Sequence, residues 1–132
     1  MENLSLRKIH IENLEYVYTI NHSVHTRKIE NDCSILTIKI WLNGRKQTPL
    51  IIEFITWCDP IIGNPLFSGF DLENKINGTI ERVNINEPKI IKKLTIHGIE
   101  NGWTGLNEIK TQDGIEYLNY FGYNTEKIIC NM

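Results

Sequence analysis

Two histidines and a cysteine have the residue types of a metal site. His22 and His25 are spaced HxxH, and Cys33 follows them. Imidazole nitrogens and thiolates are the usual ligands of zinc. The HxxH spacing would put both rings on one side of a helical turn, but the surrounding pattern is that of a strand and a loop. We therefore expect solvent-exposed histidines rather than a metal site, and no cofactor.

The residues suited to acid–base or nucleophilic chemistry form no recognisable motif. His97 and Cys58 could make a Cys/His pair, and Glu53 with Asp59 could make paired carboxylates, but any chain with several such residues offers these pairs. No serine has a GxSxG setting, and the sequence contains neither a Walker loop nor GxGxxG. We expect His97 to be a hydrogen-bonded histidine at the edge of the core. The sequence predicts no catalytic residue.

The aperiodic segment from Cys58 to Gly78 carries the residues most suited to recognition. Prolines and glycines punctuate it, and connections of this length are usually functional or disordered. Its embedded apolar residues indicate an ordered loop packed on the body of the protein. Trp57, Asp59, Asn64 and Phe67 combine aromatic and polar groups on a constrained backbone, as recognition surfaces do. Two interpretations stay open: a partner-binding surface, or a cap over an open end of the core.

Length and composition describe one globular domain, residues 1–132. The chain is 41% hydrophobic with a formal net charge of −2, so we expect no nucleic-acid partner. It has no apolar stretch of membrane length and no amino-terminal signal pattern, so we expect a cytoplasmic protein without a membrane contact. Cys33, Cys58 and Cys130 are an odd number at wide separations, so we expect reduced thiols.

A complete helix signal lies before Trp103. Asn86 can accept from the first-turn N–H groups, Pro88 suits the first helical position, and Gly102 suits the stop. The spacing predicts a helix over 87–101. Its main apolar face holds Ile90, Ile91, Leu94, His97 and Gly98. A glycine in a helix interior is costly, so we expect a neighbouring element to come close at Gly98.

The same helix has a second apolar side, formed by Ile96, Ile99 and Trp103. Something must cover it: the 58–78 loop, a second copy of the chain, or another protein. Trp103 therefore joins the candidate partner-binding residues.

Alternating hydrophobicity predicts strands on both sides of the 58–78 segment. The predicted strands are Leu6 to Ile11, Tyr16 to Ile20, Ser34 to Leu42, Pro49 to Trp57, Ile80 to Ile85 and Leu106 to Lys110. Asn43-Gly44 predicts a type I′ hairpin turn. A second helix is predicted over Gln112 to Phe121, with Asp113 as its cap. We expect an α+β fold: an antiparallel sheet of about four to six strands, with the main helix across it and the short helix beside it.

The order of these segments resembles that of a group of small bacterial proteins. The likeness is carried by YVYTI, LTIKIWLNGRKQTPLIIEF, WCDPIIGNPLFSG, VNINEPKIIKKLTIHGIENGWTG and DGIEYLNYFGY. In that group a hairpin precedes a Gly- and Pro-bearing loop, a P-x-I/V-x-x-x-I-x-x-G/A-x-x-x-G-W helix and a short final helix. The resemblance implies a common fold and no established activity, and it suggests immunity-type partners of bacterial toxins.

We therefore expect a non-enzymatic protein-interaction module, on this resemblance an immunity protein that neutralises a cognate toxin. The alternative is a small ligand-binding protein or enzyme with a pocket between the 87–101 helix and the 58–78 loop. There His97, Asp59 and Glu53 would converge. A third expectation is a homodimer formed through the second apolar side of the helix.

Overall fold

The chain has an α+β fold. The computed structural model describes residues 6–25 and 33–130. Its elements are β1 (Arg7–Ile11), β2 (Leu14–His25), β3 (Cys33–Leu42), β4 (Leu50–Trp57), α1 (Pro65–Ser68), β5 (Phe70–Asn74), β6 (Thr79–Val83), α2 (Pro88–Glu100), β7 (Gln112–Asp113) and α3 (Gly114–Tyr120). The predicted fold class, with one main helix and a short carboxy-terminal helix, is confirmed.

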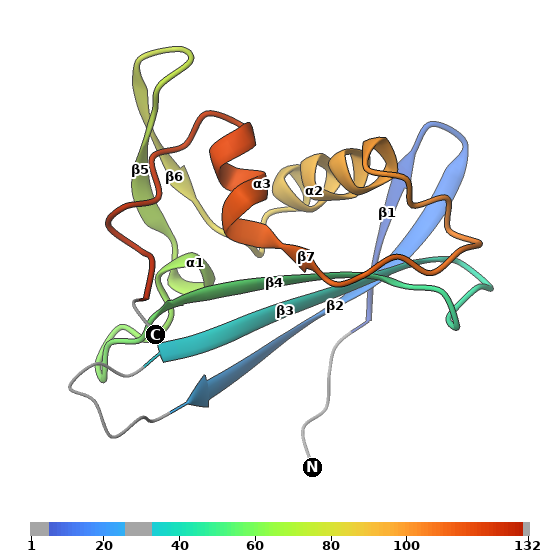
Figure 1. Ribbon diagram of the computed structural model, residues 1–132, viewed down its shortest axis with the longest axis horizontal. Coiled ribbons are helices and arrows are strands. Elements are labelled where there is room, and N and C mark those ends of the chain that lie inside the picture. The colour runs from blue at the N-terminus through green and yellow to red at the C-terminus, as the bar shows by residue number, and fades with distance from the viewer. Residues whose placement is uncertain (1–5, 26–32, 131–132) are drawn as a thin grey trace.

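The main sheet has five strands in the order β1-β2-β3-β4-β7, and β5 pairs with β6 in a separate hairpin. The pairs from β1 to β4 are antiparallel, as predicted, but β7 runs parallel to β4. A parallel neighbour requires a crossover connection. Here that connection contains α1, the β5–β6 hairpin and α2, which carry the chain back over one face of the sheet (Figure 1).

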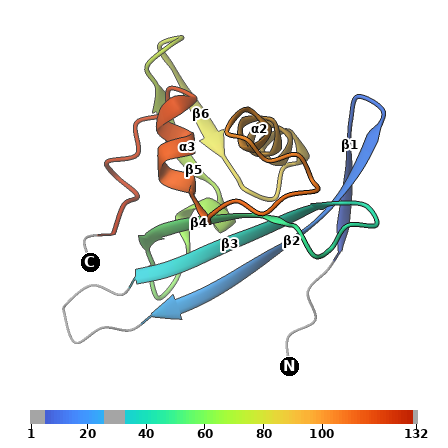
Figure 2. The same ribbon diagram turned by 45° about the vertical axis from the view of Figure 1, so that its right-hand side comes forward.

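The core lies between the sheet and α2. Even-numbered positions of β2, β3 and β4 share one face because side chains alternate along a strand. These buried residues include Tyr16, Tyr18, Leu36, Ile38, Ile40, Leu50, Ile52 and Phe54. Both views show α2, α3 and the β5–β6 hairpin on that side (Figures 1 and 2). Within residues 6–25 and 33–130, no helix covers the other face of the sheet.

Helix α2 contacts the sheet through the predicted face. Ile91 and Leu94 are fully buried. A Cβ at Gly98 would lie 3.0 Å from Cδ1 of Leu50 and closer still to Cδ2. The expected close approach at this glycine is therefore confirmed. The ends also agree with the prediction, since Pro88 opens the helix and Gly102 follows it with a φ of +110°.

The predicted cap of α2 is wrong. Glu87 is the N-cap residue, and its side chain makes no capping hydrogen bond. Asn86 instead donates from Nδ2 to the carbonyl oxygen of Phe67 at 3.1 Å and accepts from Nη1 of Arg7 at 3.2 Å. This amide joins the start of α2 to α1 and β1, so its tertiary partners replace the local cap.

Three local predictions also fail. The segment from Cys58 to Gly78 is not one loop, because it contains α1 and β5. Residues 106–110 form no strand; β7 comes just after them. The Asn43-Gly44 turn is not type I′, because Gly44 has a φ of +90° while the φ of Asn43 is not positive. The N–H of Arg45 donates to the carbonyl oxygen of Leu42 at 2.8 Å, so this is a type II turn at the start of a longer loop.

Two of the three cysteines form a disulfide. Cys33 and Cys130 are bonded, with their Cα atoms 5.8 Å apart, and Cys58 is free. The expectation of reduced thiols is wrong because an odd count leaves room for one pair. The carboxy-terminal tail makes that pair, since it runs beside the end of β4 through a bridge between Thr56 and Ile129. Disulfides persist in oxidising compartments, so this bond favours an oxidising compartment over the predicted cytoplasm.

Among the described helices, none is long and apolar enough to cross a membrane.

Candidate interaction surface

The loop that follows β4 is closed by its own hydrogen bonds. The N–H of Asp59 donates to the carbonyl oxygen of Gly63 at 3.1 Å, and the N–H of Gly63 donates back at 2.8 Å. The Asp59 carboxylate accepts from the N–H groups of Ile61, at 2.7 Å, and Ile62, at 3.1 Å. These backbone hydrogen bonds, that of Ile61 first, lower the pKa of Asp59. Asp59 therefore shapes the loop from within.

This closed loop presents large apolar side chains to solvent. Ile61 is 93% exposed and Ile62 is 52% exposed. Phe67 in α1 is 42% exposed. The Ser68 hydroxyl donates to the carbonyl oxygen of Ile62, which ties the loop to α1. We call Ile61, Ile62 and Phe67 the apolar tip. Its side chains are exposed while its backbone is held, an arrangement suited to binding with little loss of conformational entropy.

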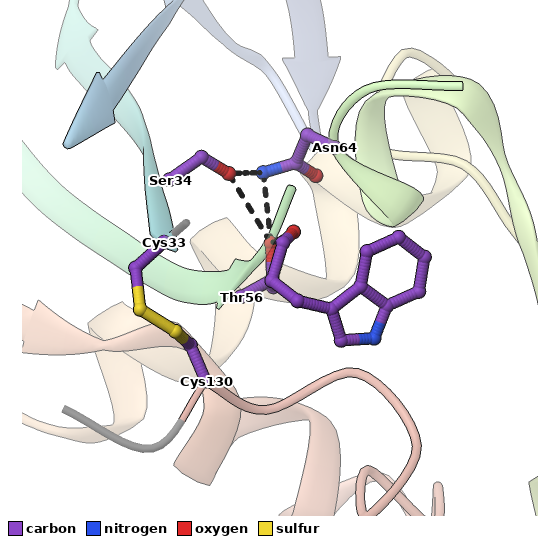
Figure 3. Close-up of a disulfide and its surroundings, with 6 residues drawn as sticks. Cys33, Ser34, Thr56, Asn64 and Cys130 are labelled. Carbon is purple, nitrogen blue, oxygen red and sulfur yellow. Dashed lines mark hydrogen bonds between the residues drawn. A yellow bond between two sulfur atoms is a disulfide. The ribbon is translucent and has the colours of Figure 1, made fainter. Parts of the chain in front are cut away.

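Asn64 is buried beneath the apolar tip, with 1% of its surface exposed, and holds the backbone of the tip in place. Its Oδ1 accepts from the N–H groups of Leu66, at 2.8 Å, and Phe67, at 3.2 Å, and so caps α1. Its Nδ2 donates to the hydroxyl oxygens of Ser34, at 2.8 Å, and Thr56, at 3.0 Å (Figure 3). Asn64 was predicted as a partner-binding residue; its burial makes it a support for the tip instead.

Trp57 fastens the carboxy-terminal tail beside this loop. Its Nε1 donates to the carbonyl oxygen of Lys127, and its backbone N–H donates to that of Ile128 at 3.2 Å. The indole also meets the ring of Phe70 edge-on, with 5.7 Å between centroids. The disulfide of Cys130 completes this attachment, and it lies next to the Ser34–Thr56–Asn64 cluster (Figure 3).

Trp103, the fifth predicted partner-binding residue, belongs to the core. It is fully buried and packs on Tyr16 with 5.8 Å between ring centroids. Its Nε1 donates to the carbonyl oxygen of Thr48 at 3.0 Å, so the loop between β3 and β4 covers it. The second apolar side of α2 therefore keeps only two exposed members, Ile96 at 44% and Ile99 at 39%.

The structure does not bring the predicted catalytic candidates together. His97 lines a cavity of about 590 Å³ beside α3, while Glu53 lines a neighbouring one of about 500 Å³ beside Ile115. The two cavities adjoin at residues 111–113, but neither is lined by both His97 and Glu53. Asp59 lines neither cavity. The predicted pocket between α2 and the 58–78 segment therefore lacks its three acid–base residues.

The metal-type residues show no site in the described part of the chain. There, no three histidine, cysteine or acidic side chains form a group that could hold a metal ion. His22 stacks on Phe67, with 5.9 Å between ring centroids and 17° between planes. The side chain of His25 lies outside the described residues.

Sequence reasoning missed the exposure of Ile61 and Ile62, which were expected to pack on the body of the protein. The available signal was the sequence DPIIG. An aspartate before a proline with a glycine four positions on favours a tight turn stabilised by the aspartate side chain. Such a turn points its central side chains outward.

Comparison with family models, with curated proteins and with solved structures found no match to this chain.

Proposed function

We propose that this chain is a non-enzymatic protein-interaction module that binds its partner through the apolar tip. One observation carries the proposal: Ile61 is 93% exposed on a loop whose backbone is closed at both ends. Ile61 shares the apolar tip with two further exposed apolar side chains, Ile62 and Phe67, and apolar anchors held on a rigid backbone are suited to the centre of an interface. The partner is expected to offer an apolar pocket for Ile61 and Ile62.

The resemblance described above supports a bacterial toxin as the partner, with this chain as its immunity protein. That assignment rests on the order of the segments and on the motif ending in Gly102-Trp103. The Cys33–Cys130 disulfide supports an oxidising compartment as the place where the two proteins meet.

Coexpression with the products of adjacent genes, followed by pull-down, tests the proposal. We expect one product to copurify with the parent chain and to be lost with Ile61→Ser. Ile80→Ser is the matched control, because Ile80 is also an exposed isoleucine, at 74%, but lies in β6. Failure of every adjacent product to copurify would refute the proposal. Equal recovery with Ile61→Ser and Ile80→Ser would refute the role of the tip.

Self-association through α2 is a separate proposal, supported by the exposed Ile96 and Ile99. Sedimentation velocity of the parent chain and of an Ile96→Ser variant tests it. A concentration-dependent dimer that the substitution abolishes is the expected result, and a monomer at high concentration would remove the idea.

A further inference from the structure

A hollow of about 590 Å³ lies between the carboxy-terminal half of α2, the chain leading into β7, and α3. These three elements adjoin one another on the covered side of the sheet in both views (Figures 1 and 2). The volume falls within the range of small-molecule sites, roughly 300–1,000 Å³. Polar and aromatic side chains line it, and none of them belongs to the apolar tip.

His97 forms one wall and is held on several sides. Its Nδ1 lies 3.1 Å from Oε1 of Glu100. The ring stacks on Tyr120 with 4.1 Å between centroids and meets Tyr117 edge-on at 4.5 Å. When Nδ1 carries the proton and donates it to Glu100, Nε2 is left as an acceptor for a ligand. The imidazole is thus oriented before any ligand arrives.

Hydrogen bonds among Tyr117, Gln112 and Asn101 hold the side chains at the base of the hollow in place. The Tyr117 hydroxyl donates to Oε1 of Gln112 at 2.9 Å, and Nδ2 of Asn101 lies 3.3 Å from the same oxygen. Nε2 of Gln112 donates to the carbonyl oxygen of Lys110 at 2.8 Å. Burial raises the pKa of Tyr117 further above its ordinary value of 10.0, and the hydroxyl is a hydrogen-bond donor at neutral pH. Groups from α2, β7 and α3 therefore hold one another in place around the hollow.

Packing between α2 and α3 explains the position of Tyr117 but not that of Tyr120. Tyr117 is 3% exposed and has an ordinary role between α2 and α3. Tyr120 is different, because the residue is 63% exposed although its ring stacks on His97. A flat aromatic ring at the rim of a polar hollow offers an apolar surface beside hydrogen-bonding groups.

We propose that this hollow binds a neutral saccharide. Saccharide hydroxyls donate and accept, which matches a lining that mixes donors such as Lys110 with acceptors such as Glu116 and His97. The C–H face of a sugar ring fits the exposed ring of Tyr120. The lining carries two carboxylates, Asp113 and Glu116, against the one ammonium of Lys110, so its net negative charge disfavours a phosphorylated ligand. An apolar ligand would exclude water from the charged side chains of Lys110 and Glu116, at a cost in free energy.

Titration of the ¹⁵N-labelled full chain, followed by heteronuclear NMR, tests this inference. The neutral probes are cellobiose and N,N′-diacetylchitobiose, and the charged probes are glucose 6-phosphate and glucosamine. We expect at least one neutral disaccharide to shift the amide signals of residues 97–101 and 112–120 saturably, at about millimolar concentration. Neither charged probe should bind as tightly as that neutral disaccharide. Absence of saturable shifts with both neutral probes up to about 20 mM would overturn the proposal, as would tighter binding of a charged probe.

Substitutions at Tyr120 distinguish a ring that binds from one that only packs. Tyr120→Ala should weaken the binding of the neutral probe by about tenfold or more, while Tyr120→Phe, which keeps the ring, should change it by less than about threefold. Unshifted amide signals of β2 and β3 report that each variant is folded. Ile61→Ser is the matched surface control and should bind the saccharide as the parent does. Unchanged binding by Tyr120→Ala in a folded variant would refute the assignment.

Discussion

Reduction of the Cys33–Cys130 disulfide should strongly destabilise the protein. The bond closes a sequence separation of 97 residues. Loop-closure entropy gives about 4–5 kcal/mol for a loop of that length. A domain of this size unfolds with about 5–15 kcal/mol, so the bond contributes a large part of the total. Chemical unfolding of the oxidised and reduced protein, in a Cys58→Ser background that prevents exchange with the free thiol, measures the difference.

With a urea dependence of about 2 kcal/mol per molar, the unfolding midpoint should fall by about 2 M on reduction. On reduction, the tail should be the first segment to lose its protection from amide hydrogen exchange. Without the covalent bond, the bridge between Thr56 and Ile129 and the hydrogen bonds from Trp57 to Lys127 and Ile128 still tie it to β4. Thiol titration of the native Cys58→Ser protein serves as the control and should find no free thiol before reduction. Two free thiols in that titration, or identical midpoints, would refute the reasoning.

Three further outcomes follow from single side chains. Asn64→Ala removes the α1 cap and two buried hydrogen bonds, so urea unfolding should show a loss of about 2–3 kcal/mol. Gly98→Ala should cost about 1–2 kcal/mol in the same assay, because crowding against Leu50 exceeds the gain of about 1 kcal/mol in helix propensity. Burial, followed by the hydrogen bond to Glu81, raises the pKa of Tyr123 to about 12 from 10.0. Stability linked to this group is therefore present below about pH 10 and is lost as the pH rises toward 12, and Tyr123→Phe should flatten that loss in unfolding curves at about pH 9 and about pH 11.

The elements with strong local signals were predictable from the sequence. The core-facing residues of β3 and β4 recur at every second position, and the two strands pair in register from Ile40 with Leu50 to Cys33 with Trp57. Helix α2 was also predictable, because its apolar positions repeat at helical spacing and Pro88 marks its start. The Asp113 cap of α3 is confirmed as well, since its carboxylate accepts from the N–H of Ile115 at 2.9 Å.

Features that depend on contacts between distant segments were not predictable. Trp103 follows a helix face that periodicity marks as outward, yet the loop containing Thr48 covers it. Asn86 had the right type for a cap, but its partners lie on α1 and β1. Cys33 meets Cys130 only because the tail returns to β4. Each of these contacts depends on the position of a segment distant in the sequence, which local propensity does not determine.

The proposed protein-binding and saccharide-binding surfaces are both attached to β4, at different points along it. The apolar tip begins where β4 ends at Trp57, whereas β7, which borders the hollow, pairs with Ile52 and Glu53. Strand β4 is an interior strand of the sheet and is buried on its core-facing side, so it gives both surfaces a fixed base. The two surfaces share no residue, and substitutions without shared partners act additively. Loss of function at one surface should therefore leave the other intact, which lets a partner protein and a saccharide be bound independently.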